Sequence, residues 1–192
     1  MIGRIRFLLQ LTHGQRIARR YFVTNGFDGA LTMMGLTMGF YTAESAVATP
    51  VVISACLGAA VALAVSGLAS AYVSESAERA RELRELEQAV VGDLQDTAHG
   101  QAARTVPVLI ATVNGLAPLA IALFIMLPLW LEQAGMALPL SGLESSLVLA
   151  FVSLFLLGAF LGTVSGRFWL ASALRTLLVA LLTAGIIYFV NA

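Results

Sequence analysis

The sequence contains few charged residues and almost none of the side chains that build disulfides or metal clusters. Only 11% of its 192 residues are charged, whereas a soluble domain has about 25%. It contains one cysteine, Cys56, two histidines and no lysine, so every basic residue is an arginine. A single cysteine excludes an intrachain disulfide and a zinc-finger spacing. The formal net charge of zero argues against a nucleic-acid-binding protein.

The patterns of an enzyme are also missing. The chain has no nucleophile–base set, no phosphate-binding glycine loop and no dense cluster of histidine and cysteine. Its two histidines, His13 and His99, are far apart in the sequence, and a lone histidine usually has no ligand-binding role. We therefore expect neither catalysis nor a bound cofactor.

What the chain does contain is apolar residues, which make up 59% of it. A helix that crosses a bilayer needs roughly 20 mostly apolar residues. Five segments meet this requirement, and turns with proline or glycine close several of them. The predicted spans are 22–43, 50–73, 107–131, 144–165 and 169–190. The sequence therefore predicts an all-α membrane protein, a single five-span transmembrane domain over residues 1–192.

Two polar segments accompany these spans. Residues 1–20 alternate isoleucine and leucine with arginine, which predicts an amphipathic helix on an anionic leaflet. Residues 74–106 follow the second span, and no proline or glycine interrupts 68–91. We therefore expect the second helix to leave the membrane and to continue as an acidic cytoplasmic helix as far as His99 and Gly100.

The arginines predict the orientation of the spans, because basic residues favour cytoplasmic loops. They precede the first span, separate the second from the third, and separate the fourth from the fifth. These residues are Arg4, Arg6, Arg16, Arg19, Arg20, Arg79, Arg81, Arg84, Arg104 and Arg167. The alternate loops contain no basic residue, and their charged residues are Glu44, Glu132 and Glu144. This difference predicts a cytoplasmic N-terminus. Arg175, inside the fifth span, either snorkels to the inner interface or pairs with an acid.

Asp28, in the first span, is the strongest candidate for a functional residue. It lies eight residues past Arg20, which is roughly 12 Å along a helix and inside the cytoplasmic half of the bilayer. A charge at mid-membrane costs about 3 kcal/mol, so the carboxylate should face a partner or water. Thr32, Gly35 and Gly39 fall on its face, where small residues allow close helix approach. The alternative is a helix N-cap at Asp28.

The second helix combines a small-residue face in the membrane with an acidic face outside it. The small residues are Ala60, Ala64, Gly67, Ala71 and Ser74, and the acids are Glu78, Glu82 and Glu85 with Glu75 at their edge. In one interpretation the acids form i,i+4 pairs with Arg79 and Arg81 on a solvated face. In the other they collect divalent cations, because carboxylate oxygens suit hard metal ions.

Two stretches of the chain together resemble the vacuolar iron transporter family, in its prokaryotic branch. They are "RRYFVTNGFDGALTMMGLTMGF" (19–40) and "SGLASAYVSESAERARELRELE" (66–87). They are similar to the family's Asn-x-x-Asp-Gly first span and to its second span, which runs into an acidic cytoplasmic helix. "ASALRTLLVALLTAG" (171–185) fits as well. In one departure, Gly67 and Ala71 stand where the family has a methionine and a glutamate.

The resemblance implies a homodimer in a prokaryotic cell membrane, with the ion path between the first two spans of each subunit. It implies export of ferrous iron, or manganese, from the cytoplasm in exchange for protons. Asp28 would bind the metal, together with Met38 or Met34. The family's metal-collecting region would correspond to Glu75, Glu78, Glu82 and Glu85.

Other functions are open to the same residues. A non-transporting scaffold or metal sensor would use the acidic cytoplasmic helix to bind a partner. An exporter of organic cations would need an aromatic-lined cavity. Aromatic residues make up only 8% of the chain and lie mostly near span ends, where an interfacial belt places them.

Overall fold

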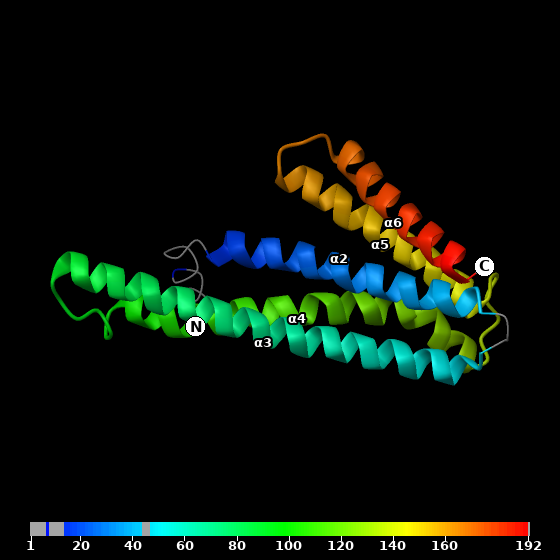
Figure 1. Cartoon of the computed structure of the whole chain (residues 1–192), viewed down its shortest axis with the longest axis horizontal. Helices are drawn as coiled ribbons and strands as arrows, with labels where there is room; N and C mark the ends of the chain where they lie inside the picture. The colour runs from blue at the N-terminus through cyan, green and yellow to red at the C-terminus, as the bar shows by residue number, and fades with distance from the viewer. Residues whose placement is uncertain (1–6, 8–13, 44–46, 192) are drawn as a thin grey trace. The chain divides into compact units, whose positions relative to one another are not determined.

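The computed structural model describes residues 7, 14–43 and 47–191, and this part of the chain contains helices and no strand. The helices are α2 (Gly14–Tyr41), α3 (Thr49–Val90), α4 (Ala98–Gln133), α5 (Gly142–Val164) and α6 (Trp169–Asn191) (Figure 1). Four of them, α3 to α6, are long and apolar enough to cross a membrane. The fold is therefore that of an all-α, multi-pass membrane protein.

Helix α2 is not among those four, although it covers the first predicted span. Asn25, Asp28 and several threonines and glycines lower the hydropathy of its apolar stretch. The first span therefore stays a prediction. The helix begins at Gly14, so residues 14–20 are continuous with it. The rest of the predicted amphipathic segment 1–20, apart from Phe7, lies outside the described residues, as does Glu44.

The second helix ends earlier than the sequence predicted. Helix α3 stops at Val90 and α4 starts at Ala98, so His99 and Gly100 belong to the following helix. The prediction is wrong because Val91 takes a left-handed conformation, φ 51°, where a helix cannot continue. The Glu87 side chain then accepts a hydrogen bond from the Leu94 N–H at 3.1 Å and fixes the turn.

The chain divides into two compact units, and the first comprises residues 1–25 and 64–117. Its described core is small: Ala102, Val106 and Ile110 of α4 pack with Ile17 and Tyr21 of α2.

The second unit comprises residues 26–63 and 118–192 and holds the larger core. Its fully buried side chains come from α2 to α5 and include Met33, Met34, Val52, Cys56, Ile125, Met126, Leu129 and Leu154. Gly29 lets α2 approach α4 closely, since a Cβ at this position would lie 2.7 Å from the Cα of Pro118. This backbone contact sets which face of α2 is buried.

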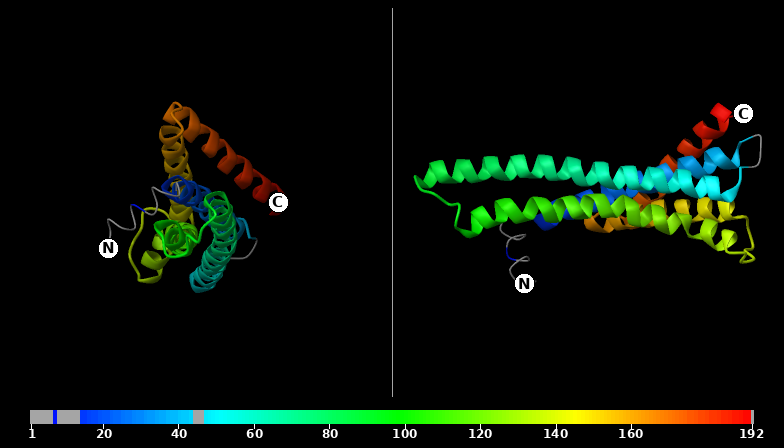
Figure 2. Two further views of the ribbon diagram at one scale, coloured as in Figure 1. Left: turned by 90° about the vertical axis from the view of Figure 1, so that its left-hand side faces the viewer. Right: turned by 90° about the horizontal axis from the view of Figure 1, so that it is seen from below.

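Helices α5 and α6 form an antiparallel hairpin within the second unit; they lie side by side in Figure 1 and diverge from their common turn in the left view of Figure 2. Gly158 and Gly162 let the two helices pack closely: a Cβ at Gly158 would lie 3.0 Å from the Cα of Ala173, and one at Gly162 would lie 2.7 Å from that of Trp169. Gly166 instead makes the turn, with φ 67°.

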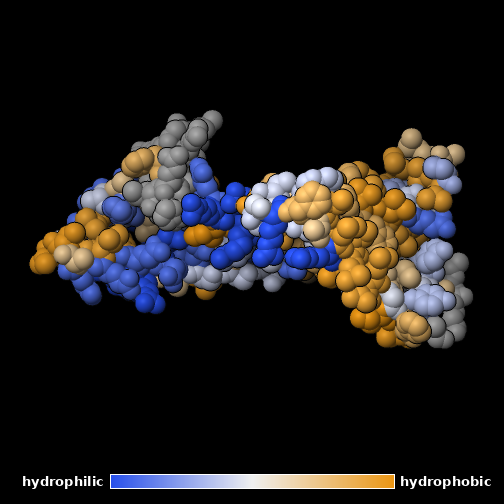
Figure 3. All heavy atoms as spheres, turned by 90° about the horizontal axis from the view of Figure 1, so that it is seen from above, coloured by the Kyte–Doolittle hydropathy of each residue, from blue (hydrophilic) through white to orange (hydrophobic). Residues whose placement is uncertain are grey.

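The outer face of this hairpin is apolar. Only 11% of the most hydrophobic window of α6 is buried, against 44% in α4. The exposed side chains are Leu174, Leu178, Leu181, Leu182, Ile186 and Phe189. Figure 3 shows the hydrophobic surface that lies over the hairpin. A surface of this kind requires lipid or another protein chain around it.

Candidate functional site

Asp28 lies half-way along α2, and its side chain is exposed. A residue at this position cannot cap the N-terminus of the helix, so the interpretation of Asp28 as an N-cap is wrong. In the part of the chain that the structure describes, no hydrogen bond or ion pair reaches its carboxylate. Asp28 is therefore a carboxylate without a hydrogen-bond or ion-pair partner among the described residues.

The face of α2 that carries Asp28 is largely open. A Cβ at Gly39 would meet nothing within 4 Å, and one at Gly35 would meet only the side-chain tip of Ile187, at 3.6 Å. The close approach expected on this face is made on another face, by Gly29 against Pro118. The small-residue face of Asp28, Thr32, Gly35 and Gly39 thus stays accessible within one chain.

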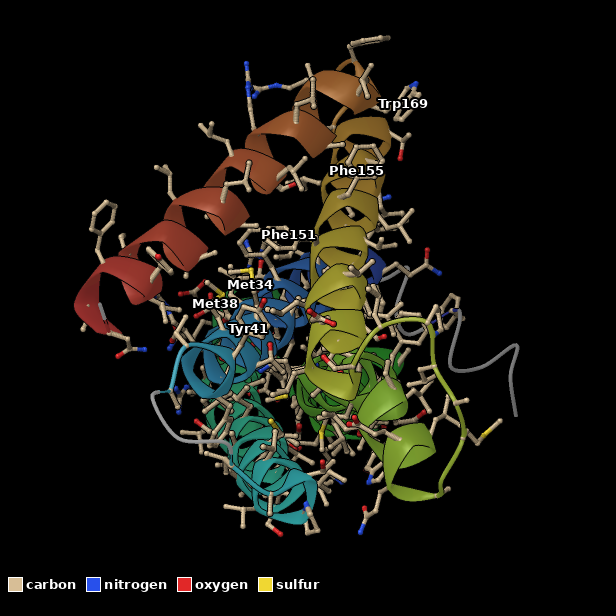
Figure 4. The ribbon with its side chains drawn as sticks, turned by 90° about the vertical axis from the view of Figure 1, so that its right-hand side faces the viewer. Met34, Met38, Tyr41, Phe151, Phe155 and Trp169 are labelled. Carbon is tan, nitrogen blue, oxygen red and sulfur yellow. The ribbon has the colours of Figure 1, made fainter. Side chains whose placement is uncertain are left out.

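The two methionines predicted to accompany Asp28 lie elsewhere. Met34 is fully buried in the core of the second unit, in the same cluster as Phe151, and Figure 4 shows the two side chains together with Met38. Met38 is half-buried and ten residues from Asp28, roughly 15 Å along the helix axis. The structure therefore does not bring either methionine to the carboxylate of its own chain.

No group of three or more histidine, cysteine, aspartate or glutamate side chains within residues 7, 14–43 and 47–191 is placed to hold a metal ion. A divalent ion usually takes six or more ligands if it is hard, or four if it is zinc. Asp28 therefore belongs to no preformed group of such ligands among these residues.

The acidic part of α3 carries its own counter-ions. Arg79 lies 3.6 Å from Glu75 and pairs also with Glu82, while Arg81 Nε donates to Glu85 at 2.8 Å. The expected i,i+4 pairs are thereby confirmed. The hydrogen bond to Glu85, and then the charges of Glu85 and Glu78, raise the pKa of Arg81. Three of the four predicted metal-collecting carboxylates already have an arginine partner.

Glu75 is placed differently from the prediction. It is only 7% exposed and Arg79 only 5%, so the pair lies inside the first unit rather than at the edge of a solvated stripe. Gly67, Ala71 and Glu75 are spaced four residues apart, so they lie on one face of α3, and all three are buried. Within the described residues, Glu75 Oε2 and Arg79 Nε have no hydrogen-bond partner.

A buried polar network joins three helices of the first unit. The Asn114 side chain, 3% exposed, donates to the carbonyl of Gly67 at 2.6 Å and accepts from the side chain of Asn25. Asn25 donates also to the carbonyl of Tyr21 at 3.2 Å. Asn114 of α4 therefore hydrogen-bonds across to both α3 and α2.

Gly67 has a structural reason to lack a side chain. A Cβ there would lie 3.1 Å from the Asn114 backbone oxygen and 3.4 Å from its amide nitrogen. A methionine at this position would displace the Asn114 side chain from the Gly67 carbonyl. The hydrogen bond of Asn114 to the Gly67 carbonyl thus favours a residue without a side chain at this position.

Comparisons of the chain with protein-family models, with curated proteins and with solved structures give no match. The resemblance to the vacuolar iron transporters therefore stays a prediction.

Proposed function

We propose that this protein is a transporter that exports a divalent metal cation, ferrous iron or manganese, from the cytoplasm in exchange for protons. The observation that carries the proposal is Asp28, an exposed carboxylate half-way along a helix of a multi-pass membrane protein, with no partner in the part of the chain that the structure describes. A charge at membrane depth costs about 3 kcal/mol unless it meets water, a cation or another chain. Such residues commonly mark ion paths and proton relays.

In this proposal α2 also crosses the membrane, as the first of five spans. The N-terminus is cytoplasmic, and the membrane is that of a prokaryotic cell. The 28 residues of α2 give it a length of about 42 Å, enough to cross the hydrocarbon core. Its low hydropathy comes from polar residues that would face a partner helix rather than lipid. Asn25 already does so, since it hydrogen-bonds Asn114.

The proposed protein is a homodimer, because the described residues of one chain supply too few ligands for a divalent metal ion. Two copies would meet over the open face of Thr32, Gly35 and Gly39, which brings their two Asp28 carboxylates together. Water would complete the coordination of the metal. A carboxylate that binds either a proton or a cation couples the two fluxes by competition. Met38, half-buried further along α2, would line the path beyond this site.

The test is metal-driven proton flux in proteoliposomes, with ferrous iron, manganese, cobalt and calcium compared in turn. Asp28→Asn removes the charge at almost constant volume, so flux should fall to the level of protein-free liposomes while the protein stays folded. Asp96→Asn removes an exposed charge in the turn between α3 and α4 and should leave flux unchanged. Undiminished flux in Asp28→Asn would refute the assignment of the site.

The second candidate is a non-transporting scaffold or metal sensor that binds a partner through its cytoplasmic helix. It is favoured by the arginine partners of Glu75, Glu82 and Glu85. Of the four predicted metal-collecting acids, Glu78 alone has no ion pair among the described residues. A helix whose charges are mostly neutralised suits protein contact better than cation capture. This candidate predicts no flux of any tested metal from well-folded wild-type protein.

A further inference from the structure

The α5–α6 hairpin carries one carboxylate, Glu144, which forms a capping box with Ser141 at the start of α5. The rest of the hairpin, residues 145–192, contains Arg167 and Arg175 but neither aspartate nor glutamate. Both arginines are exposed, and no hydrogen bond or ion pair to Arg175 is formed within the described residues. An unpaired guanidinium on a membrane-spanning helix is unfavourable unless an anion from outside the chain neutralises it.

The position of Arg175 indicates where that anion lies. Arg175 follows the start of α6, at Trp169, by six residues, or roughly 9 Å of helix axis. Side chains of a helix point back toward its N-terminus. The guanidinium is thus directed toward the α5–α6 turn, where Arg167 lies, and this is the end of the helix that reaches the headgroup region.

The face of α6 around Arg175 is the one in contact with lipid. Ala173 and Ala180, on the opposite face, are buried, and Ala173 packs against α5. Leu178 and Leu182, on the side of Arg175, are each 59% exposed. At the turn, Phe168 and Trp169 are 66% and 46% exposed, with ring centroids 6.3 Å apart. Exposed aromatic side chains of this kind are typical of the membrane–water interface.

We propose that Arg175 and Arg167 bind the phosphate of an anionic phospholipid in the leaflet that contains the α5–α6 turn. A guanidinium presents paired N–H donors that match phosphate oxygens. Ala171, exposed and small, lies one turn before Arg175 on its side of the helix and leaves room for the headgroup. The two positive charges near the α5–α6 turn, with the one carboxylate of the hairpin at the other end of α5, favour an anionic over a zwitterionic lipid.

Asp28 of a second copy is the competing partner, because it also lies eight residues beyond an interfacial arginine, Arg20. The side chains around Arg175 argue against it. Leu178, Leu182 and Ile186 are bulky, whereas close contact between membrane helices favours small residues. The lipid site depends on the membrane location of the hairpin and not on the transport activity proposed above.

Native mass spectrometry of the purified full-length protein tests the site, with dioleoylphosphatidylglycerol compared with dioleoylphosphatidylcholine. The wild-type protein should retain the anionic lipid preferentially. Arg175→Gln and Arg167→Gln should each weaken its binding about fivefold, which corresponds to about 1 kcal/mol per basic residue at the surface. Phosphatidylcholine binding should not change. Arg175→Lys, which keeps the charge, should stay within about twofold of wild type.

Arg84→Gln is the matched control, because it removes an exposed arginine from the cytoplasmic part of α3 and should leave lipid retention unaltered. If both Arg175→Gln and Arg167→Gln bind phosphatidylglycerol as wild type does, the proposal is overturned. It is overturned also if Asp28→Asn increases lipid binding several-fold while Arg175→Gln weakens self-association, since Arg175 would then pair with Asp28. If Arg175→Gln does not fold, Arg167→Gln and Arg175→Lys decide the outcome.

Discussion

At the scale of single residues, burial separates acids that look alike in the sequence. Glu75 and Glu85 both have an arginine four residues away, and both pairs form. The first pair is almost completely buried, whereas the side chains of the second are 68% and 60% exposed. An exposed ion pair contributes little because water screens it, but a buried charge that loses its partner is costly.

Glu75→Gln should therefore destabilise the protein by about 1–3 kcal/mol. The buried Arg79 keeps Glu82 as a partner, which holds the loss below that of a complete break. Glu85→Gln, the matched control, should change the free energy of unfolding by less than about 0.5 kcal/mol. Chemical unfolding in detergent, followed by circular dichroism, measures both. Equal losses from the two substitutions would contradict the buried role of Glu75.

The hydrogen bond between Asn114 and Gly67 shows how far a single polar contact can be predicted from the sequence. An asparagine in an apolar run predicts an interhelical hydrogen bond, because its amide has no other partner in lipid. Which carbonyl it meets depends on how closely two helices approach, and a single glycine 47 residues away decides this. Side-chain periodicity along one helix carries no information about that distance. The network could be anticipated, but its members could not.

At the scale of helices, close packing depends on what lies opposite each glycine. Gly162 and Gly39 both belong to small-residue patterns, yet a Cβ at Gly162 would lie 2.7 Å from the backbone of α6, and one at Gly39 would meet nothing. Gly162→Ala must push α5 and α6 apart and should cost about 1–3 kcal/mol. Gly39→Ala should be neutral or stabilising by up to about 1 kcal/mol, because alanine favours the helix. Thermal unfolding in detergent compares the two.

A hairpin that tolerated Gly162→Ala as well as Gly39→Ala would contradict the close α5–α6 contact. A control for the substitution itself is Gly58→Ala, which also enters open space, on α3.

The helices were easier to predict from the sequence than their ends. Apolar runs of about 20 residues located α3 to α6, because a membrane imposes that length on any spanning helix. The end of α3 was missed by nine residues, since Val91 is not a residue type that signals a left-handed turn. Local hydrogen bonds fix this end: the Gly92 N–H donates to the Glu87 carbonyl at 3.2 Å, and the Leu94 N–H donates to the Glu87 side chain at 3.1 Å.

At the scale of the whole molecule, the candidate site is incomplete in one chain. Composition and apolar runs predicted a multi-pass membrane protein, and the structure agrees. The site could not be completed from the sequence or from one chain, because Met34 belongs to the core and Met38 lies too far along α2. What remains for Asp28 is its open face, and a second copy of the chain is the partner that the proposed function requires.

Gly39→Leu tests that partnership without touching the carboxylate. The new side chain enters space that is empty within one chain, so the fold should persist, while two α2 helices in contact over this face should be forced apart. Light scattering after size exclusion should then report a monomer in place of the wild-type dimer, with metal-driven flux lost as well. Gly58→Leu adds the same bulk where α3 is exposed and should stay dimeric. A Gly39→Leu protein that remained dimeric and active would place the second copy, and the ion path, on a different face of the molecule.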